Sequence, residues 1–134
     1  MSTGITLTYS NTSNRVITAA VYLASNGDGT KTAIIPNTVT AIGASAFASL
    51  GSNLTAVTIP NNVISIGNNA FKGSALTSII IPNSVTSVGT LVFQSCNKLI
   101  SVTIENNMIG QSMFQGCKNL ESAIIRSSVT TVNK

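Results

Sequence analysis

The sequence predicts a mainly β repeat solenoid, because one short phrase returns along the chain at nearly constant spacing. Residues 35–43 read IPNTVTAIG, and close copies stand at residues 59–67 (IPNNVISIG) and 81–89 (IPNSVTSVG). These copies begin 24 and 22 residues apart. Sequence periods of about 20–50 residues are typical of solenoids, in which each unit buries its apolar face only against its neighbours. The repeated phrase therefore predicts stacked coils of similar shape.

The second copy shows what each coil should contain. Residues 57–59 alternate between apolar and polar side chains, as a half-buried strand does. Pro60 should end that strand, because proline has no N–H for a ladder. We expect Gly67 to adopt a backbone conformation that is closed to other residues. Residues 68–71 should then form a short helical or 3₁₀ turn that places Phe71 inside.

Apolar residues recur in four columns that keep the same register in every coil. All four phenylalanines of the chain fall in one column, namely Phe47, Phe71, Phe93 and Phe114. The other three columns are Leu54, Leu76, Leu99 and Leu120; Val57, Ile79, Val102 and Ala123; and Ile35, Ile59, Ile81, Ile104 and Ile125. Because each buried Phe or Leu contributes about 1.5–3 kcal/mol of transfer free energy, these columns suffice as the core of a small solenoid.

The chain should form one structural domain with two parts. Residues 30–134 are expected to form about four and a half repeats of 21–24 residues, with a worn copy of the phrase at 104–110 and a fifth that breaks off at the C-terminus. Residues 1–29 do not follow the repeat, and two strands are expected over 5–9 and 16–22. An open solenoid end exposes core and strand edges, so we expect residues 1–29 to be an N-terminal β cap.

Composition excludes several classes of function. Only 7% of the residues are charged, against roughly 25% in an ordinary soluble domain. The net charge of +4 comes from scattered cations with few aromatic residues among them, so no nucleic-acid partner is expected. The chain has no apolar stretch long enough to span a bilayer, and no signal peptide is visible in its first twenty residues. We therefore expect no membrane insertion.

The chain carries little catalytic chemistry. It has no histidine, and its three acids, Asp28, Glu105 and Glu121, stand in unrelated positions of the repeat. We therefore expect no enzyme activity, no catalytic residue, no metal site and no cofactor. Cys96 and Cys117 occupy the same slot of consecutive units. Two stacked buried thiols are the favoured interpretation of this pair, with a disulfide or a metal site as alternatives.

Residues 76–89 read LTSIIIPNSVTSVG, and this phrase resembles the leucine-rich repeats of the BspA type. The resemblance covers residues 30–134 and implies a right-handed leucine-rich-repeat solenoid with a parallel sheet along one face. In bacteria and some protozoa, similar repeats belong to large surface proteins that bind host or neighbouring-cell molecules. The resemblance thus implies a cell-surface or extracellular location and a protein or cell-surface component as partner.

We expect a non-enzymatic interaction or adhesion module that binds through a flat, uncharged strand face and through the C-terminal end of the array. The expected partner-binding residues are Ser78, Ile80, Ser101, Thr103, Ser122, Ile124, Val129 and Val132. The alternative is a structural building block of a virion or filament, which would self-associate through its solenoid end. Two further interpretations stay open, an ice- or crystal-binding surface and a plain solvated sheet face.

Overall fold

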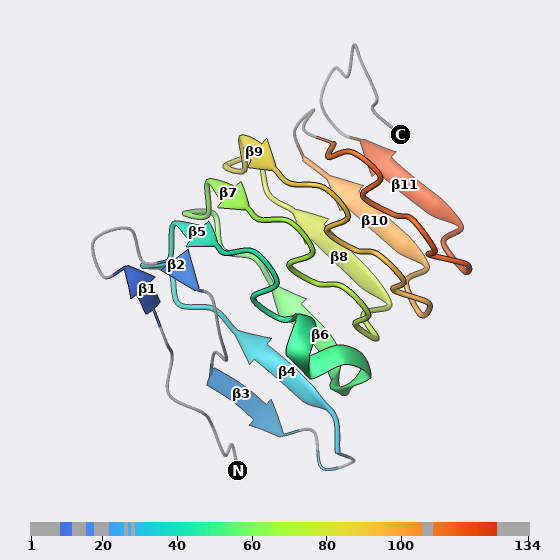
Figure 1. Cartoon of the computed structure of the whole chain (residues 1–134), viewed down its shortest axis with the longest axis horizontal. Helices are drawn as coiled ribbons and strands as arrows, with labels where there is room; N and C mark the ends of the chain where they lie inside the picture. Colours follow the sequence, from blue (N-terminus) through green and yellow to red (C-terminus); the bar gives the residue numbers. More distant parts are fainter. Residues whose placement is uncertain are drawn as a thin grey trace.

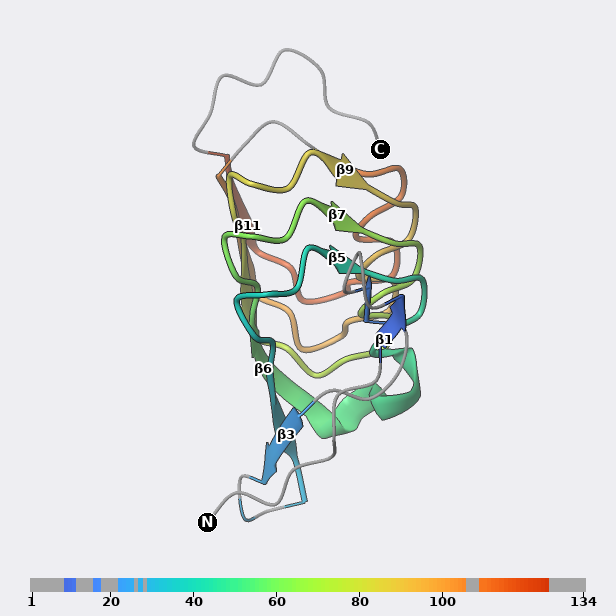
Figure 2. The same ribbon diagram turned by 90° about the vertical axis from the view of Figure 1, so that its left-hand side faces the viewer.

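The computed structural model describes residues 9–11, 16–17, 22–25, 27, 29–105 and 109–125. The chain winds in successive coils, and each coil runs along two opposite walls of the stack (Figures 1 and 2). The first wall holds strands β3 (Tyr22–Ser25), β4 (Lys31–Ile34), β6 (Leu54–Thr58), β8 (Ser78–Ile81), β10 (Ser101–Ile104) and β11 (Ser122–Ile125). The second holds β1 (Tyr9–Asn11), β2 (Val16–Ile17), β5 (Ala41–Ile42), β7 (Ser65–Ile66) and β9 (Ser87–Val88). The predicted mainly β parallel solenoid is confirmed.

The first wall is divided into two hydrogen-bonded sheets. Strands β8, β10 and β11 pair in parallel with every residue in register, so that Val102 lies between Ile79 and Ala123. Strand β6 pairs in parallel with β4, and the register shifts between Lys31 and Thr32. No ladder joins β6 to β8, although the two strands follow one another along the wall (Figure 1). The first wall therefore has a seam between its two halves.

Antiparallel pairs stand at the N-terminal end of both walls. Strand β3 pairs antiparallel with β4, and β1 pairs antiparallel with β2, which in turn lies parallel to β5. These strands lie where a cap would cover the first coil. Much of the segment 1–29 lies outside the described residues, so its role as a separate cap stays a prediction.

The connections between the walls are mostly turns. A single described helix, η1, is a 3₁₀ helix over Ala48–Asn53, and it contains a kink at Gly51. The helical turn expected at 68–71 is a plain turn. It nevertheless places Phe71 in the core, as predicted, because the backbone N–H of Phe71 donates to the carbonyl of Val92 in the next coil at 2.9 Å.

The phenylalanine column forms the centre of the stack. Successive ring centroids lie 5.0, 5.3 and 5.8 Å apart, with interplanar angles of 6–8°. Phe47, Phe71 and Phe93 are completely buried, whereas Phe114 in the last described coil is only half-buried. Stacked aromatic pairs add about 0.5–1.5 kcal/mol each beyond the area they bury, so this column helps to hold neighbouring coils together.

The repeated glycine serves a different purpose from the one expected. Gly67 does not have a positive φ, so the expectation of a special backbone conformation is wrong. Its N–H instead donates to the carbonyl of Ile42 at 2.8 Å, and a Cβ on Gly67 would lie 2.6 Å from the backbone nitrogen of Ala44. A Cβ on Gly89 would meet the nitrogen of Asn68 at the same 2.6 Å. Glycine is required because the backbones of adjacent coils approach too closely for any side chain.

A left-handed backbone position recurs two residues before each phenylalanine. The residues there are Ser45, Asn69, Leu91 and Ser112, with φ between 49° and 59°. Asparagine and serine are tolerated in this region, whereas a branched apolar residue such as leucine pays a larger steric cost. Leu91 is therefore a site of local strain in the third coil.

We predict that Leu91→Asn raises the free energy of unfolding by about 0.5–1 kcal/mol, because asparagine adopts the left-handed conformation more readily. Urea unfolding followed by circular dichroism measures the change. Leu91→Ala is the matched control, since it removes the same side-chain contacts without relieving the backbone, and it should give no gain. A Leu91→Asn variant that is no more stable than the Leu91→Ala variant would contradict the predicted relief of backbone strain.

Candidate interaction surface

Strands β8, β10 and β11 bring the predicted face residues together in two columns. The ladder places Ser101 between Ser78 and Ser122, and Thr103 between Ile80 and Ile124. The predicted columns are therefore real neighbours on one wall. That they bind a partner stays a prediction. The other two expected binding residues, Val129 and Val132, lie outside the described residues.

The face extends further towards the N-terminus than the sequence indicated. In β4, Ile34 pairs with Thr58 of β6, and Thr32 pairs with Ala56. Across the seam, these pairs repeat the two-column pattern on two further strands, β6 and β4. Ile34 directly precedes Ile35, which belongs to a predicted core column. Because side chains alternate along a strand, Ile34 is expected on the outward face.

We call this surface the Ile/Thr face. It consists of the outward column Ile34, Thr58, Ile80, Thr103 and Ile124 and the flanking column Thr32, Ala56, Ser78, Ser101 and Ser122. The exposed fractions of the three isoleucines are 46% (Ile34), 56% (Ile80) and 49% (Ile124).

The two sides of the strands differ sharply in burial. Ile79, Ile81, Val102 and Ile104, which alternate with the face residues, are all buried. The outward isoleucines thus contribute little to the core, and they expose apolar area that a partner could remove from water. Threonine and serine between them supply hydroxyl groups without charge. The face can therefore bind a partner through apolar contact and neutral hydrogen bonds.

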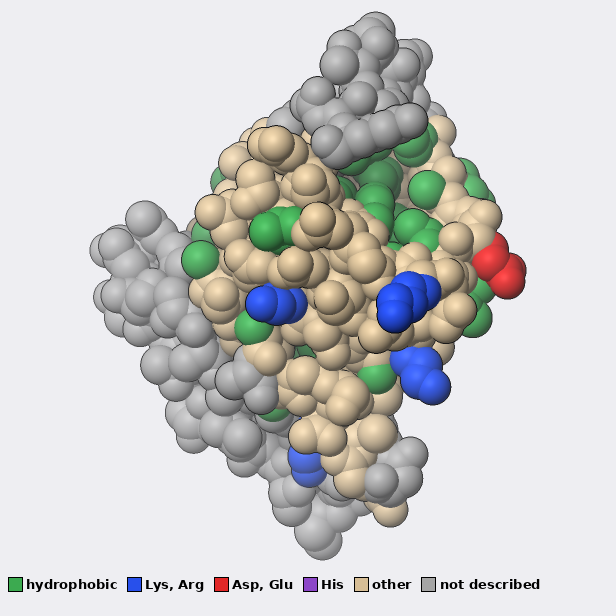
Figure 3. Space-filling model, turned by 45° about the vertical axis from the view of Figure 1, so that its right-hand side comes forward, with side chains coloured by type: hydrophobic (Ala, Val, Ile, Leu, Met, Phe, Trp, Pro, Cys, Tyr) green, Lys and Arg blue, Asp and Glu red, His purple; other side chains and the backbone are tan. Residues whose placement is uncertain are grey.

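Charged groups are also sparse on another side of the stack. Figure 3 shows a side of the stack on which uncharged polar groups predominate, with a few separate lysines or arginines and an acidic side chain at one edge. Apolar side chains gather in the same view near the C-terminal end of the stack.

The last described coil is less covered than the coil before it. Phe93, Leu99 and Val102 are buried in the third unit, whereas the corresponding Phe114 and Leu120 are half-buried and Ala123 is exposed. The inward columns are thus less buried in this coil than in the coil before it. This end is a second surface at which apolar contact with another molecule is possible.

Cys96 and Cys117 are free thiols, but only Cys96 is buried as the favoured interpretation expected, and Cys117 is half-buried. Each donates a hydrogen bond to a phenylalanine carbonyl of the preceding coil, Cys96 Sγ to Phe71 at 3.2 Å and Cys117 Sγ to Phe93 at 3.0 Å. The hydroxyl of Ser74, which holds the same slot one coil earlier, lies 3.2 Å from Cys96 Sγ. The cysteine at this position therefore links each turn to the backbone of the preceding coil by a hydrogen bond.

The two thiols also influence each other's ionisation. If the Cys117 thiol turns its hydrogen from the Phe93 carbonyl to an ionised Cys96, this hydrogen bond lowers the pKa of Cys96 to about 7, against the opposing effect of burial. The same contact, with burial, raises the pKa of Cys117, because a second thiolate would stand beside the first. The pair thus holds one negative charge far more readily than two.

The described residues contain no cluster of side chains that could hold a metal ion. Within them, no three histidine, cysteine, aspartate or glutamate side chains come together as a metal site would require. Glu105 follows β10, and Glu121 precedes β11 on the neighbouring coil. Among the same residues, no helix has the length and apolar character to cross a bilayer.

Comparison with known proteins agrees with this architecture. Residues 22–134 match the family described as BspA type leucine rich repeat region, in six copies. None of the curated proteins matches the chain. A crystal structure of a leucine-rich repeat protein from Bacteroides ovatus is similar over 70% of this chain, with 32% sequence identity and a TM-score of 0.65. The similar region spans a quarter of the Bacteroides chain. The chain therefore belongs to the BspA-type leucine-rich repeat family.

Proposed function

We propose that the protein is a non-enzymatic binding module that attaches to another protein or a cell-surface component through the Ile/Thr face. The observation that carries the proposal is the column of three isoleucines, each about half exposed, with Ile80 and Ile124 on one parallel sheet and Ile34 on the neighbouring sheet of the same wall. Isolated exposed apolar residues need no explanation, but isoleucines that recur on alternate strands of one face form a row of apolar contacts with threonines between them.

Family membership supports the same class of function. Repeat solenoids are quasi-one-dimensional scaffolds that present extended surfaces for recognition. Similar BspA-type repeats in surface proteins support a partner outside the cell or on a neighbouring cell. The low charge of the face, with threonine and serine between the isoleucines, favours a partner whose contact surface is also neutral.

The double variant Ile80→Asp/Ile124→Asp should lower binding to cell surfaces at least tenfold, because it places carboxylates in the centre of the apolar column. Fluorescently labelled protein titrated onto a panel of bacterial and animal cells, read by flow cytometry, measures the binding. Ile64→Asp is the matched control, since Ile64 is 52% exposed but precedes β7 on the opposite wall. Equal loss in the control and the double variant, or no saturable binding of the unaltered protein, would contradict the proposal.

A second candidate function is supported by the C-terminal end of the stack. There Ala123 is exposed and Phe114 and Leu120 are only half-buried, although their counterparts one coil earlier are buried. A molecule that covers this end would complete the core, and a second copy of the chain could do so in a filament or virion component. This alternative makes the protein a building block rather than a receptor.

Light scattering over a concentration series separates the two candidates. The building-block function predicts a mass that grows with concentration and returns to that of a monomer in Ala123→Lys, because a lysine there would leave a charge in the covered end. Ser122→Lys is the matched control, since Ser122 is an exposed neighbour that faces outward from the same strand. A stable monomer at high concentration contradicts the building-block function and leaves the Ile/Thr face as the proposed binding surface.

A further inference from the structure

The two cysteines of the chain form a stacked pair in neighbouring coils. Each stands three residues after the phenylalanine of its coil, in the turn that leads back to the first wall. Next to the pair, the backbone N–H of Ser95 donates to the carbonyl of Gln115 at 2.8 Å, which joins the two turns. Coils joined by such hydrogen bonds lie about 5 Å apart, within the Cα separations of about 4.4–6.8 Å that a disulfide spans.

The side chains at this position contact their counterparts in the next coil. The hydroxyl of Ser74 lies 3.2 Å from Cys96 Sγ. Cys117 Sγ lies 3.0 Å from the carbonyl oxygen of Phe93, which also accepts the backbone N–H of Cys96 at 3.2 Å. The Cys117 sulfur therefore lies against the turn that carries Cys96, and its thiol can donate a hydrogen bond to an ionised Cys96.

We propose that Cys96 and Cys117 are a peroxide-sensitive modification site, at which oxidation joins the two sulfurs in a disulfide between the third and fourth coils. The site uses both cysteines of the chain, so no other disulfide can form within one molecule. It does not rest on the binding function of the Ile/Thr face.

The two thiols have different roles in the reaction because they differ in exposure. Cys117 is half-buried, so an oxidant as small as hydrogen peroxide reaches its sulfur, whereas Cys96 is completely buried. With the pKa of Cys96 at about 7, the pair carries a thiolate near neutral pH, and the thiolate is the nucleophile in cysteine oxidation. Because the remaining hydrogen lies between the two sulfurs, that negative charge belongs to the pair and is available at Cys117.

The reaction has two steps, and hydrogen peroxide is the oxidant. The Cys117 thiolate attacks one peroxide oxygen, the O–O bond breaks, and hydroxide leaves and takes up a proton to form water. Cys117 is then a sulfenic acid. The Cys96 thiol loses its proton and attacks the Cys117 sulfur, the S–O bond breaks, and the departing hydroxide takes up that proton. Two thiols and one peroxide thus give one disulfide and two waters.

The structure loses little when the bond forms. Each thiol gives up its hydrogen bond to a phenylalanine carbonyl, but the carbonyl of Phe93 keeps the N–H of Cys96 at 3.2 Å. The carbonyl of Phe71 likewise keeps the N–H of Ser74 at 3.2 Å. Neither carbonyl is left without a donor, so oxidation does not create a buried unsatisfied group. The new bond restricts the unfolded chain and joins the fourth coil to the better buried third coil.

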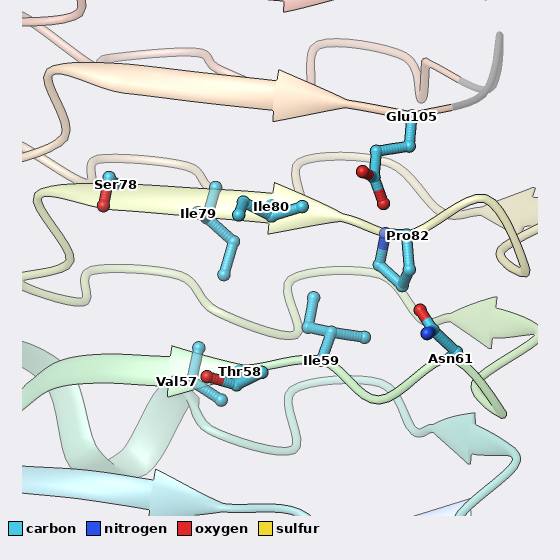
Figure 4. A pocket seen from close by; sticks show the side chains of 9 residues that line it. All are labelled: Val57, Thr58, Ile59, Asn61, Ser78, Ile79, Ile80, Pro82 and Glu105. Atoms are coloured by element: carbon cyan, nitrogen blue, oxygen red, sulfur yellow. The ribbon is translucent and has the colours of Figure 1, made fainter. Parts of the chain in front are cut away.

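The modification site lies away from the seam in the first wall. A hollow of about 390 Å³ opens at that seam, and the residues that line it include Thr58, Ser78 and Ile80 of the Ile/Thr face (Figure 4). Neither cysteine lines this hollow or belongs to the columns of the face. Oxidation should therefore strengthen the attachment of the fourth coil, which carries Ile124, and leave the face at the seam unchanged.

Peroxide treatment of the reduced protein tests the site directly. Trypsin cleaves after Lys98 and Lys118, so the two cysteines fall in separate peptides, 73–98 and 99–118. After brief exposure to a small excess of hydrogen peroxide and alkylation of the remaining thiols, we expect these peptides to be joined by a bond that dithiothreitol cleaves, in a protein that is still monomeric. Two separately alkylated peptides, or a disulfide between two protein molecules, would overturn the proposal.

Two serine variants separate the roles of the thiols. Serine fits the position, since Ser74 occupies it one coil earlier and is buried. Cys96→Ser should accumulate a sulfenic acid at Cys117 that dimedone traps, because no second thiol stands beside it. Cys117→Ser should react with peroxide at least about tenfold more slowly than Cys96→Ser, because its remaining thiol is buried. The opposite order of reactivity would contradict the assigned roles.

The melting temperature shows whether the bond holds the fourth coil. The oxidised protein should melt about 5–10 °C above the reduced protein by circular dichroism, and dithiothreitol should reverse the gain. Cys96→Ser, taken through the same treatment, is the matched control and should show no reversible gain. An oxidised protein that melts no higher than the reduced one would contradict a cross-link between the two coils.

Discussion

The stacking of each coil on its predecessor is the constraint on which the rest of the structure depends. Four phenylalanine rings lie one above another with centroids 5.0–5.8 Å apart, and glycines bring the backbones of the opposite wall into contact. Because both are kept, the inward columns remain aligned and the strands of β8, β10 and β11 stay in exact register.

Inward residues of each strand hold the coils together, and this leaves the outward side of the first wall available for binding. Alternation along each strand sends Ile79 and Ile81 to the core and Ile80 to solvent. The core therefore tolerates changes on the Ile/Thr face, since outward residues touch few inward ones. Because the coils stack, exposed isoleucines at equivalent positions of different coils line up in one column along the wall. A surface of this kind follows from the repeat itself and needs no separate binding loop.

The sequence predicted the features that repeat and missed those that depend on differences between coils. The phenylalanine column, the cysteine slot and the outward residues of β8, β10 and β11 all follow from copies of one phrase. The seam does not follow from the phrase, because residues 57–59 and 79–81 have the same strand pattern. Whether strands β6 and β8 pair depends on the three-dimensional arrangement of two coils of different length, 24 and 22 residues. Likewise, the recurrence of glycine in each copy of the phrase could not show whether glycine is needed there for a positive φ or for a close approach of two backbones.

The position of Ile34 illustrates the same limit at the edge of the array. The sequence placed its neighbour Ile35 in a core column, but the first strand lacks the leucine that marks the start of later units, so its outward residues were not assigned. Pairing with β6 makes the assignment unambiguous.

The central claim is that the inward columns hold the coils together while the outward face is free to bind. The most direct test compares the free energies of unfolding of Phe71→Ala and Ile80→Ala by urea titration. The account predicts a loss of about 3–5 kcal/mol for Phe71→Ala, because it opens a cavity in the middle of the ring stack. It predicts a change within about 0.5 kcal/mol for Ile80→Ala, as for an ordinary surface position. Comparable losses in the two variants would contradict the account.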